Sequence, residues 1–211
     1  YLMTEAESAS IHSEIAPEDL ARADLYALLA RLFYAPPDEQ LLIALRGAEE
    51  ISVEGGDPGL AESWQAVRTA AAEVDSEKVA DEYQQLFIGV GKAEVTLYGS
   101  HYLMAIMAGH PLAQLRSTLA ELKLARSRSV TEPEDHIAAL AEVMRFLIVG
   151  DAKTLPADVS VQEHFFSRYL GPWYRQFCEL LAHKPGAKFY RSVAQLTQAF
   201  LDLEKESFET F

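Results

Sequence analysis

Apolar residues recur every three to four positions along nearly the whole chain, and the positions between them are mostly polar. Such spacing is typical of amphipathic α-helices, which turn one apolar side toward a core. The first predicted helix collects large apolar side chains on one face: Leu25, Leu28, Leu29, Leu32 and Phe33. No stretch alternates apolar and polar residues as a half-buried strand does. The pattern therefore predicts an all-α fold of about ten helices.

Proline, glycine and acidic residues divide this pattern into separate helices. Pro17 suits the first position of a helix, Glu18 and Asp19 suit its first turn, and Pro36 ends it. The segment 88–97 carries no sustained period and is predicted to be a loop. The helices are expected over residues 17–35, 38–47, 60–74, 76–87, 98–108, 112–126, 133–149, 159–170, 172–183 and 187–208.

The predicted helices form one domain with two unequal halves. A polar, non-periodic segment at 127–132 separates an N-terminal half, 15–126, from a C-terminal half, 133–211. A chain of 211 residues is long enough for one sizeable core. The first 14 residues precede the first helix and are expected to be flexible.

The acidic balance restricts the possible partners. The net charge is −14, from 32 acidic and 18 basic side chains. A phosphate backbone would be repelled, so nucleic acid is excluded as a partner. A basic peptide would be attracted, and added salt would slow its association. The acidity also has a simpler interpretation, which is that it keeps the protein soluble.

Cysteine usage and hydropathy point to the cytoplasm. Cys178 is the single cysteine, so an internal disulfide and a multi-thiolate zinc site are excluded, and it is expected to be buried among apolar neighbours. No apolar run approaches the ~20 residues that cross a bilayer, so membrane insertion is not expected. The N-terminal segment is acidic and does not resemble a secretory signal.

Asp135 and His136 are the first candidates for chemistry. Pro133 is predicted to start a helix, which would place both residues in its first turn, near free backbone N–H groups. Adjacent helical positions point about 100° apart, so the two cannot form a tight dyad, and no nucleophile motif accompanies them. Two interpretations remain open: a helix-dipole partner beside an interior histidine, or an acceptor and a donor for a ligand.

Metal and phosphate sites are not supported by the spacing. The six histidines include no pair four residues apart on a helix, and no metal site is expected. Gly89 and Gly91 lie in a loop next to Lys92, but a helix rather than a strand precedes them, and the spacing of a phosphate-binding loop is missing. These glycines are expected to supply positive φ angles.

Tyr98, Ser100 and Tyr102 follow that loop. On a helix the two tyrosines share a face, where they offer aromatic walls with polar tips. They fit a peptide or small-ligand groove, and they fit equally a capped helix start with two core tyrosines. The residues do not indicate a catalytic site.

Two motifs together resemble those of the TorD/DmsD family of redox-enzyme maturation chaperones. The first runs Tyr83-x-x-Leu86-Phe87-x-Gly89-x-Gly91 and continues Tyr98-x-Ser100-x-Tyr102; the second is Glu132-Pro133-x-Asp135-His136. The resemblance extends through Leu170-Gly171-Pro172-Trp173 to Leu201. It implies an all-helical cytoplasmic chaperone, not an enzyme, that binds the twin-arginine leader of the catalytic-subunit precursor of a molybdopterin oxidoreductase until its cofactor is inserted.

The resemblance also implies site residues and assembly states. The leader would bind a groove lined by Tyr98, Ser100, Tyr102, Glu132, Pro133, Asp135 and His136, with Asp135 as the acceptor for its polar region. No cofactor is expected to bind tightly; the resemblance to the family allows the binding of GTP. The protein would be a monomer or a domain-swapped homodimer, with the hinge at 127–132. Two alternatives stay open: a guanine-nucleotide-dependent enzyme that gates cofactor delivery, and a helical assembly subunit without a peptide site.

Overall fold

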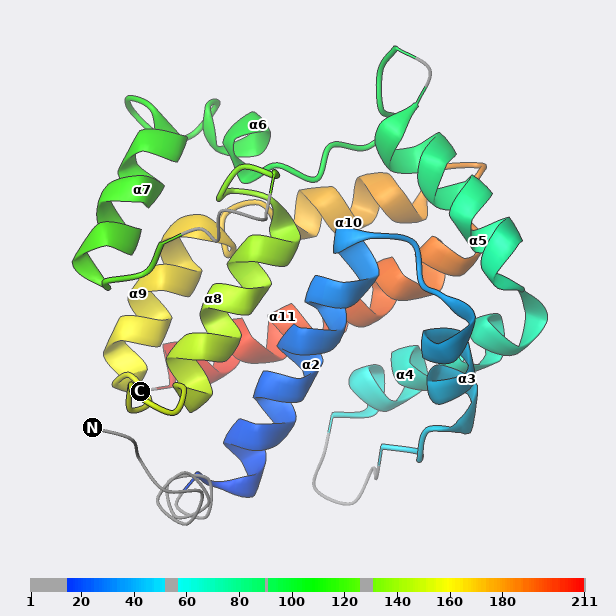
Figure 1. Cartoon of the computed structure of the whole chain (residues 1–211), viewed down its shortest axis with the longest axis horizontal. Coiled ribbons are helices and arrows are strands. Elements are labelled where there is room, and N and C mark those ends of the chain that lie inside the picture. The colour runs from blue at the N-terminus through cyan, green and yellow to red at the C-terminus, as the bar shows by residue number, and fades with distance from the viewer. Residues whose placement is uncertain (1–14, 52–56, 90, 126–130, 211) are drawn as a thin grey trace.

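The computed structural model describes residues 15–51, 57–89, 91–125 and 131–210 (Figure 1). The segment 1–14 and most of the predicted hinge lie outside the described residues. Within the described ranges the chain forms ten α-helices and one π-helical turn. No strand occurs there, only two isolated antiparallel bridges. The prediction of an all-α fold is confirmed.

Prolines and aspartates start many of the helices. Proline occupies the first turn of α2, α4 and α7, and Asp38, Asp57 and Asp75 each accept a backbone N–H at the starts of α3, α4 and α5. The elements are α2 Pro17–Tyr34, α3 Glu39–Gly47, α4 Pro58–Glu73, α5 Ser76–Tyr83, the π-helical turn η1 Gln84–Ile88, α6 Gly99–Leu103, α7 Pro111–Glu121, α8 Ile137–Val149, α9 Val159–Tyr169, α10 Tyr174–Ala182 and α11 Phe189–Glu209.

The most extensive packing joins the two halves of the chain. Helix α8 runs beside α2, and the long α11 passes behind them to reach α4 and α10 (Figure 1). The ring of Tyr26 on α2 meets the edge of Phe200 on α11, with centroids 4.8 Å apart. Each half therefore supplies the apolar partner for helices of the other.

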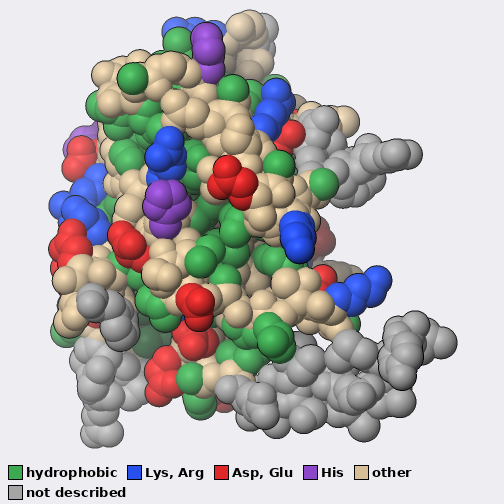
Figure 2. Space-filling view, turned by 90° about the vertical axis from the view of Figure 1, so that its left-hand side faces the viewer, with side chains coloured by type: hydrophobic (Ala, Val, Ile, Leu, Met, Phe, Trp, Pro, Cys, Tyr) green, Lys and Arg blue, Asp and Glu red, His purple; other side chains and the backbone are tan. Residues whose placement is uncertain are grey.

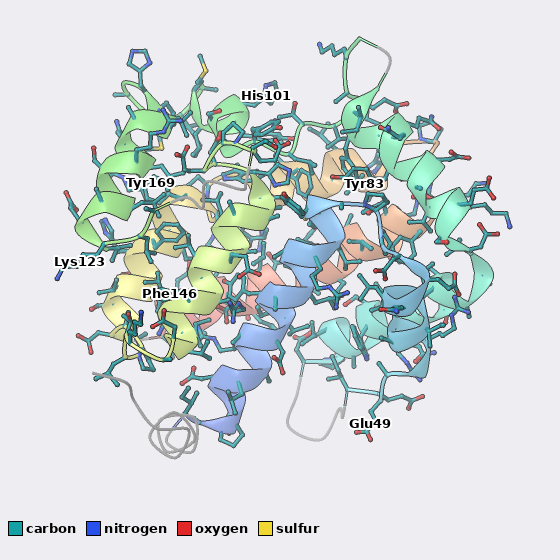
Figure 3. The ribbon with its side chains drawn as sticks, viewed as in Figure 1. Glu49, Tyr83, His101, Lys123, Phe146 and Tyr169 are labelled. Carbon is teal, nitrogen blue, oxygen red and sulfur yellow. The ribbon has the colours of Figure 1, made fainter. Side chains whose placement is uncertain are left out.

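Aromatic side chains fix the C-terminal end of α2. The Phe33 ring packs against Phe177 and Phe87, with centroids 5.3 and 6.1 Å away. The Tyr83 hydroxyl, labelled in Figure 3, donates to the carbonyl of Phe33 at 2.9 Å, and the Tyr190 hydroxyl donates to that of Leu32 at 2.8 Å. These bonds occupy carbonyls that the end of a helix leaves without a partner.

The start of α11 is capped by a side chain from another helix. The Glu82 carboxylate on α5 accepts the backbone N–H groups of Lys188, Phe189 and Tyr190 at 2.8–3.2 Å. Since α11 has no side-chain cap of its own, Glu82 both supplies acceptors and matches the positive end of the helix.

A buried ion pair links the lower part of α2 to α11. The Arg22 guanidinium donates to both carboxylate oxygens of Glu204, at 2.7 and 3.0 Å, and the Tyr26 hydroxyl donates to the same carboxylate at 3.0 Å. Arg22 also donates to the amide oxygen of Gln162 on α9 at 3.1 Å. The Glu204 side chain is 3% exposed, so the carboxylate depends on these donors.

Three predicted boundaries were wrong, and the largest error concerns Pro133. That residue does not start a helix, because the chain at 135–137 pairs with 97–99 before α8 begins at Ile137. Helix α6 ends at Leu103 and turns follow it, whereas a helix was predicted to residue 108. Helix α7 ends at Glu121, short of the predicted 126. For both α6 and α7 the apolar spacing in the sequence continues past the last helical residue, so the predicted helices were too long.

Candidate functional site

The two sequence motifs meet in space through a short antiparallel bridge between Tyr98 and His136. The backbone N–H of Gly99 donates to the Asp135 carbonyl, and that of Ile137 donates to the Leu97 carbonyl, both at 2.8 Å. This bridge sets the start of α6 against the start of α8. The structure thus brings together most of the residues that the sequence marks as candidates.

Asp135 binds the start of α6. Its carboxylate accepts the backbone N–H of Ser100 at 2.9 Å, and the residue is 4% exposed. Tyr98, at the N-cap position of α6, forms no capping bond with its own side chain. Asp135 therefore caps α6 from outside that helix.

His136 caps the next helix. Its Nδ1 atom accepts the backbone N–H of Ala138 at 3.2 Å, at the first turn of α8. A neutral imidazole that accepts at Nδ1 carries its proton on Nε2. Burial lowers the pKa of His136, and the nearby carboxylates of Glu132 and Asp135 oppose that shift in part. Neutral His136 is the form that this geometry requires.

The titration of His136 is a first testable consequence. We expect its pKa in the folded protein to lie below the ordinary value of 6.5, and its proton to sit on Nε2 at neutral pH. Because the folded-state pKa is the lower one, the stability from this group is fully present above about pH 6.5 and decreases as the pH falls. Nitrogen-detected NMR of the imidazole would measure both; a pKa above 6.5 would contradict the expected burial effect.

Tyr98 and Glu132 form the outer part of the same cluster. The Tyr98 hydroxyl donates to the Glu132 carboxylate, and the Tyr98 ring meets the His136 ring edge to face at 5.3 Å. Burial, and then the bond to Glu132, raises the pKa of Tyr98. The phenol stays protonated at neutral pH and keeps donating to the carboxylate.

Tyr102 belongs to the core. Its ring stacks on Trp173 with centroids 5.0 Å apart, its hydroxyl donates to the carbonyl of Thr96 at 2.9 Å, and 6% of the residue is exposed. Burial raises the pKa of the Tyr102 hydroxyl. The sequence allowed Tyr102 to line a ligand groove or to lie in the core, and these contacts place it in the core.

Gly89 and Gly91 shape the loop after η1. Their φ angles are +66° and +93°, as expected from the sequence. A Cβ atom on Gly89 would lie 2.1 Å from the carbonyl oxygen of Lys92, so glycine is required at that position. The loop follows helical turns and contributes no residue to the cleft described next.

A cleft of about 510 Å³ opens beside His136, between α2, α8 and the chain that follows α7. Its floor is mainly apolar, and Phe146, labelled in Figure 3, lies farthest along α8. Glu132 and His136 are the predicted site residues that line it; the other predicted residues lie outside its lining. The lining consists of Ala30, Arg31, Tyr34, Leu119, Leu124, Ala125, Glu132, Glu134, His136, Ala138, Ala139, Glu142, Val143, Arg145 and Phe146.

Charged side chains surround this floor. Glu132, Glu134 and Glu142 line the cleft together with two arginines, of which Arg145 pairs with Glu142 at 3.0 Å. The Glu134 carboxylate is bound at 2.9 Å by Arg116 on α7. The side of the molecule that carries α7 and α9 shows hydrophobic side chains between acidic and basic ones (Figure 2).

The sequence motifs did not include the apolar floor of the cleft. Ala139, Val143 and Phe146 are three or four positions apart and form a second apolar face of α8, beside the face that is buried in the core. An α-helix that is apolar over more than one face needs a second partner. This excess of apolar residues was the signal in the sequence that could have located the floor.

Other kinds of site find no support in the described ranges. These residues include no group of three or more His, Cys, Asp or Glu side chains placed to hold a metal ion. Cys178 is buried, as predicted, and burial raises the pKa of its thiol, which disfavours the reactive thiolate. No helix in the described chain has the length and apolarity to span a membrane.

Fold and site together define a class: an all-helical protein with an open apolar cleft and a charged rim, features typical of peptide-binding proteins. The family described as nitrate reductase delta subunit matches residues 54–179, more than half of the chain. The chain belongs to this family, the TorD/DmsD family of redox-enzyme maturation chaperones that its motifs resemble.

Individual relatives agree with this assignment. The chaperone protein TorD of Shewanella loihica is 28% identical over 205 residues, which cover 90% of this chain and 94% of the relative. A protein of Haemophilus influenzae assigned as the Tat proofreading chaperone DmsD is 29% identical over 123 residues, 57% of each chain. These relatives are chaperones, and the prediction that this protein is not an enzyme is confirmed.

A solved structure shares the fold. The crystal structure of a proposed redox enzyme maturation protein from Archaeoglobus fulgidus superposes with a TM-score of 0.54. It is 19% identical in sequence, and the match covers 87% of this chain and 93% of the other. The helical arrangement described above is therefore found in a second chain of distant sequence.

Proposed function

We propose that this protein is a cytoplasmic maturation chaperone for a molybdopterin oxidoreductase, and that it binds the N-terminal leader of the catalytic-subunit precursor in the cleft between α2 and α8. In this role it would hold the precursor from export until the molybdenum cofactor is inserted. Membership in the TorD/DmsD family supports the chaperone role.

The observation that carries the proposal is the pairing of an apolar floor with acidic groups at its rim. A twin-arginine leader combines a basic region with an apolar stretch, so its receptor needs a hydrophobic groove beside carboxylates. The cleft offers Val143 and Phe146 on its floor, and three glutamates around them. The net charge of −14 would speed the approach of a basic peptide at low salt.

The test is calorimetry against a panel of twin-arginine leader peptides. We expect at least one leader to bind with a micromolar dissociation constant, and Ala139→Gln to weaken it at least tenfold, about 1.4 kcal/mol. Ala139 lines the cleft, and a glutamine there would fill the apolar space with an amide.

The matched control is Ala113→Gln, an exposed alanine at the same third position of α7. It should bind as the wild type does. If no leader binds, peptide recognition is wrong for this protein; if Ala139→Gln binds unchanged, the leader uses another surface.

A further inference from the structure

We infer that Asp135 is a positioning residue in leader binding, whose carboxylate holds α6 against the start of α8 and does not touch the leader. This inference rests on the proposed function and deepens it. Direct contact with the basic residues of the leader is assigned instead to the carboxylates that line the cleft: Glu132, Glu134 and Glu142.

The first argument is the geometry of the carboxylate. Oδ2 of Asp135 accepts the Ser100 N–H at 2.9 Å, and the carbonyl of the same residue accepts the Gly99 N–H at 2.8 Å. Asp135 is 4% exposed and is not among the residues that line the cleft. A leader arginine could reach this carboxylate only by displacing a backbone bond that α6 does not replace from its own sequence.

The second argument is the packing on the far side of α6. A Cβ atom on Gly99 would lie 3.2 Å from Nε1 of Trp173, so the backbone of α6 rests directly on the indole. Tyr102 stacks on the same ring. The start of α6 is thus packed against the Trp173 ring and bonded to the Asp135 carboxylate.

The third argument is the connection from Asp135 to the cleft. The next residue, His136, caps α8 and lines the cleft, while its bridge partner Tyr98 donates to Glu132 at the rim. Loss of the bond between Asp135 and Ser100 would remove the side-chain link between α6 and the start of α8 and leave the two backbone bonds of the bridge to hold the Tyr98 segment. The Asp135 carboxylate thus contributes, together with this bridge, to the positions of Glu132 and His136.

The experiment compares Asp135→Asn, Asp135→Ala and Glu142→Gln by calorimetry with a binding leader at two salt concentrations. Asparagine keeps an oxygen that accepts from Ser100 but removes the charge. We expect Asp135→Asn to bind within threefold of the wild type with the same salt dependence, and Asp135→Ala to bind at least tenfold more weakly. Glu142→Gln should reduce the salt dependence.

Hydrogen exchange at the Ser100 amide provides a readout that does not need a leader. Exchange should speed up in Asp135→Ala and stay slow in Asp135→Asn and Glu142→Gln. The inference is overturned if Asp135→Asn loses binding tenfold with a flatter salt dependence, or if Asp135→Ala binds as the wild type does. If the wild type binds no leader, the proposed function fails, and the Ser100 exchange rates alone decide whether Asp135 holds α6.

Discussion

Replacing Glu204 by alanine is expected to lower the free energy of unfolding by about 3 kcal/mol. The substitution would leave the Arg22 guanidinium, whose side chain is 20% exposed, without the carboxylate that accepts two of its N–H bonds. The buried Tyr26 hydroxyl would lose its acceptor as well. Urea-induced unfolding followed by far-UV circular dichroism measures the change.

The control for this prediction is Glu206→Ala, an exposed glutamate two residues further along α11. This substitution also removes a glutamate side chain from α11, and it should change the free energy of unfolding by no more than about 0.5 kcal/mol. Equal effects of the two substitutions would show that the buried network contributes nothing beyond the helix itself.

Replacing Trp173 by alanine is expected to cost about 3–5 kcal/mol, the range for truncating a buried large aromatic side chain. The indole is 1% exposed, stacks on Tyr102, meets the Phe177 ring at 5.8 Å and donates to the carbonyl of Tyr169 at 2.5 Å. Its removal would leave a cavity beneath α6 and an unpaired carbonyl.

Leu180→Ala provides the comparison, because Leu180 lies on α10, the helix whose N-cap position Trp173 occupies, but is 44% exposed. Chemical denaturation of both variants should show a loss well under half as large for Leu180→Ala. A Trp173→Ala protein as stable as the wild type would mean that the stacked pair does not hold α6 in place.

Helix positions followed from the sequence where a local signal decides them. Pro17 and Pro36 enclose α2, because proline acts through its own backbone geometry. Gly47 is the last residue of α3, as predicted, although its φ angle is not in the left-handed region that the prediction assumed. The break between α9 and α10 at Gly171 and Pro172 was predicted on the same grounds and is confirmed. These features require no knowledge of the tertiary structure.

The start of α8 could not be predicted in this way. Pro133 is a valid first residue of a helix, but Glu134 and Asp135 form a turn, and His136 is held extended in a bridge to Tyr98. The bonds of this bridge join residues 135–137 to residues 97–99, and Gly99 and Asp135 are separated by 36 positions. A long-range pairing overrode the local preference.

The candidate site also has a part that the sequence predicts and a part that it does not. The motifs identified the residues at the junction of α6 and α8, because polar and aromatic groups gather there in the sequence. The floor of the cleft has no motif, since alanine, valine and phenylalanine also fill ordinary helical cores. Only the packing of α2 and α7 around α8 decides which apolar residues of α8 stay open to a ligand.

The pairing of α2 with α8 has a consequence during synthesis on the ribosome. One wall of the cleft is made early and the other only after Ile137–Val149 has emerged, since chains are built from the N-terminus. A nascent chain that stops before that point lacks the helix with the most extensive packing on α2, and with it the α8 side of the cleft. The cleft therefore forms only after α8 has been synthesised and has packed against α2.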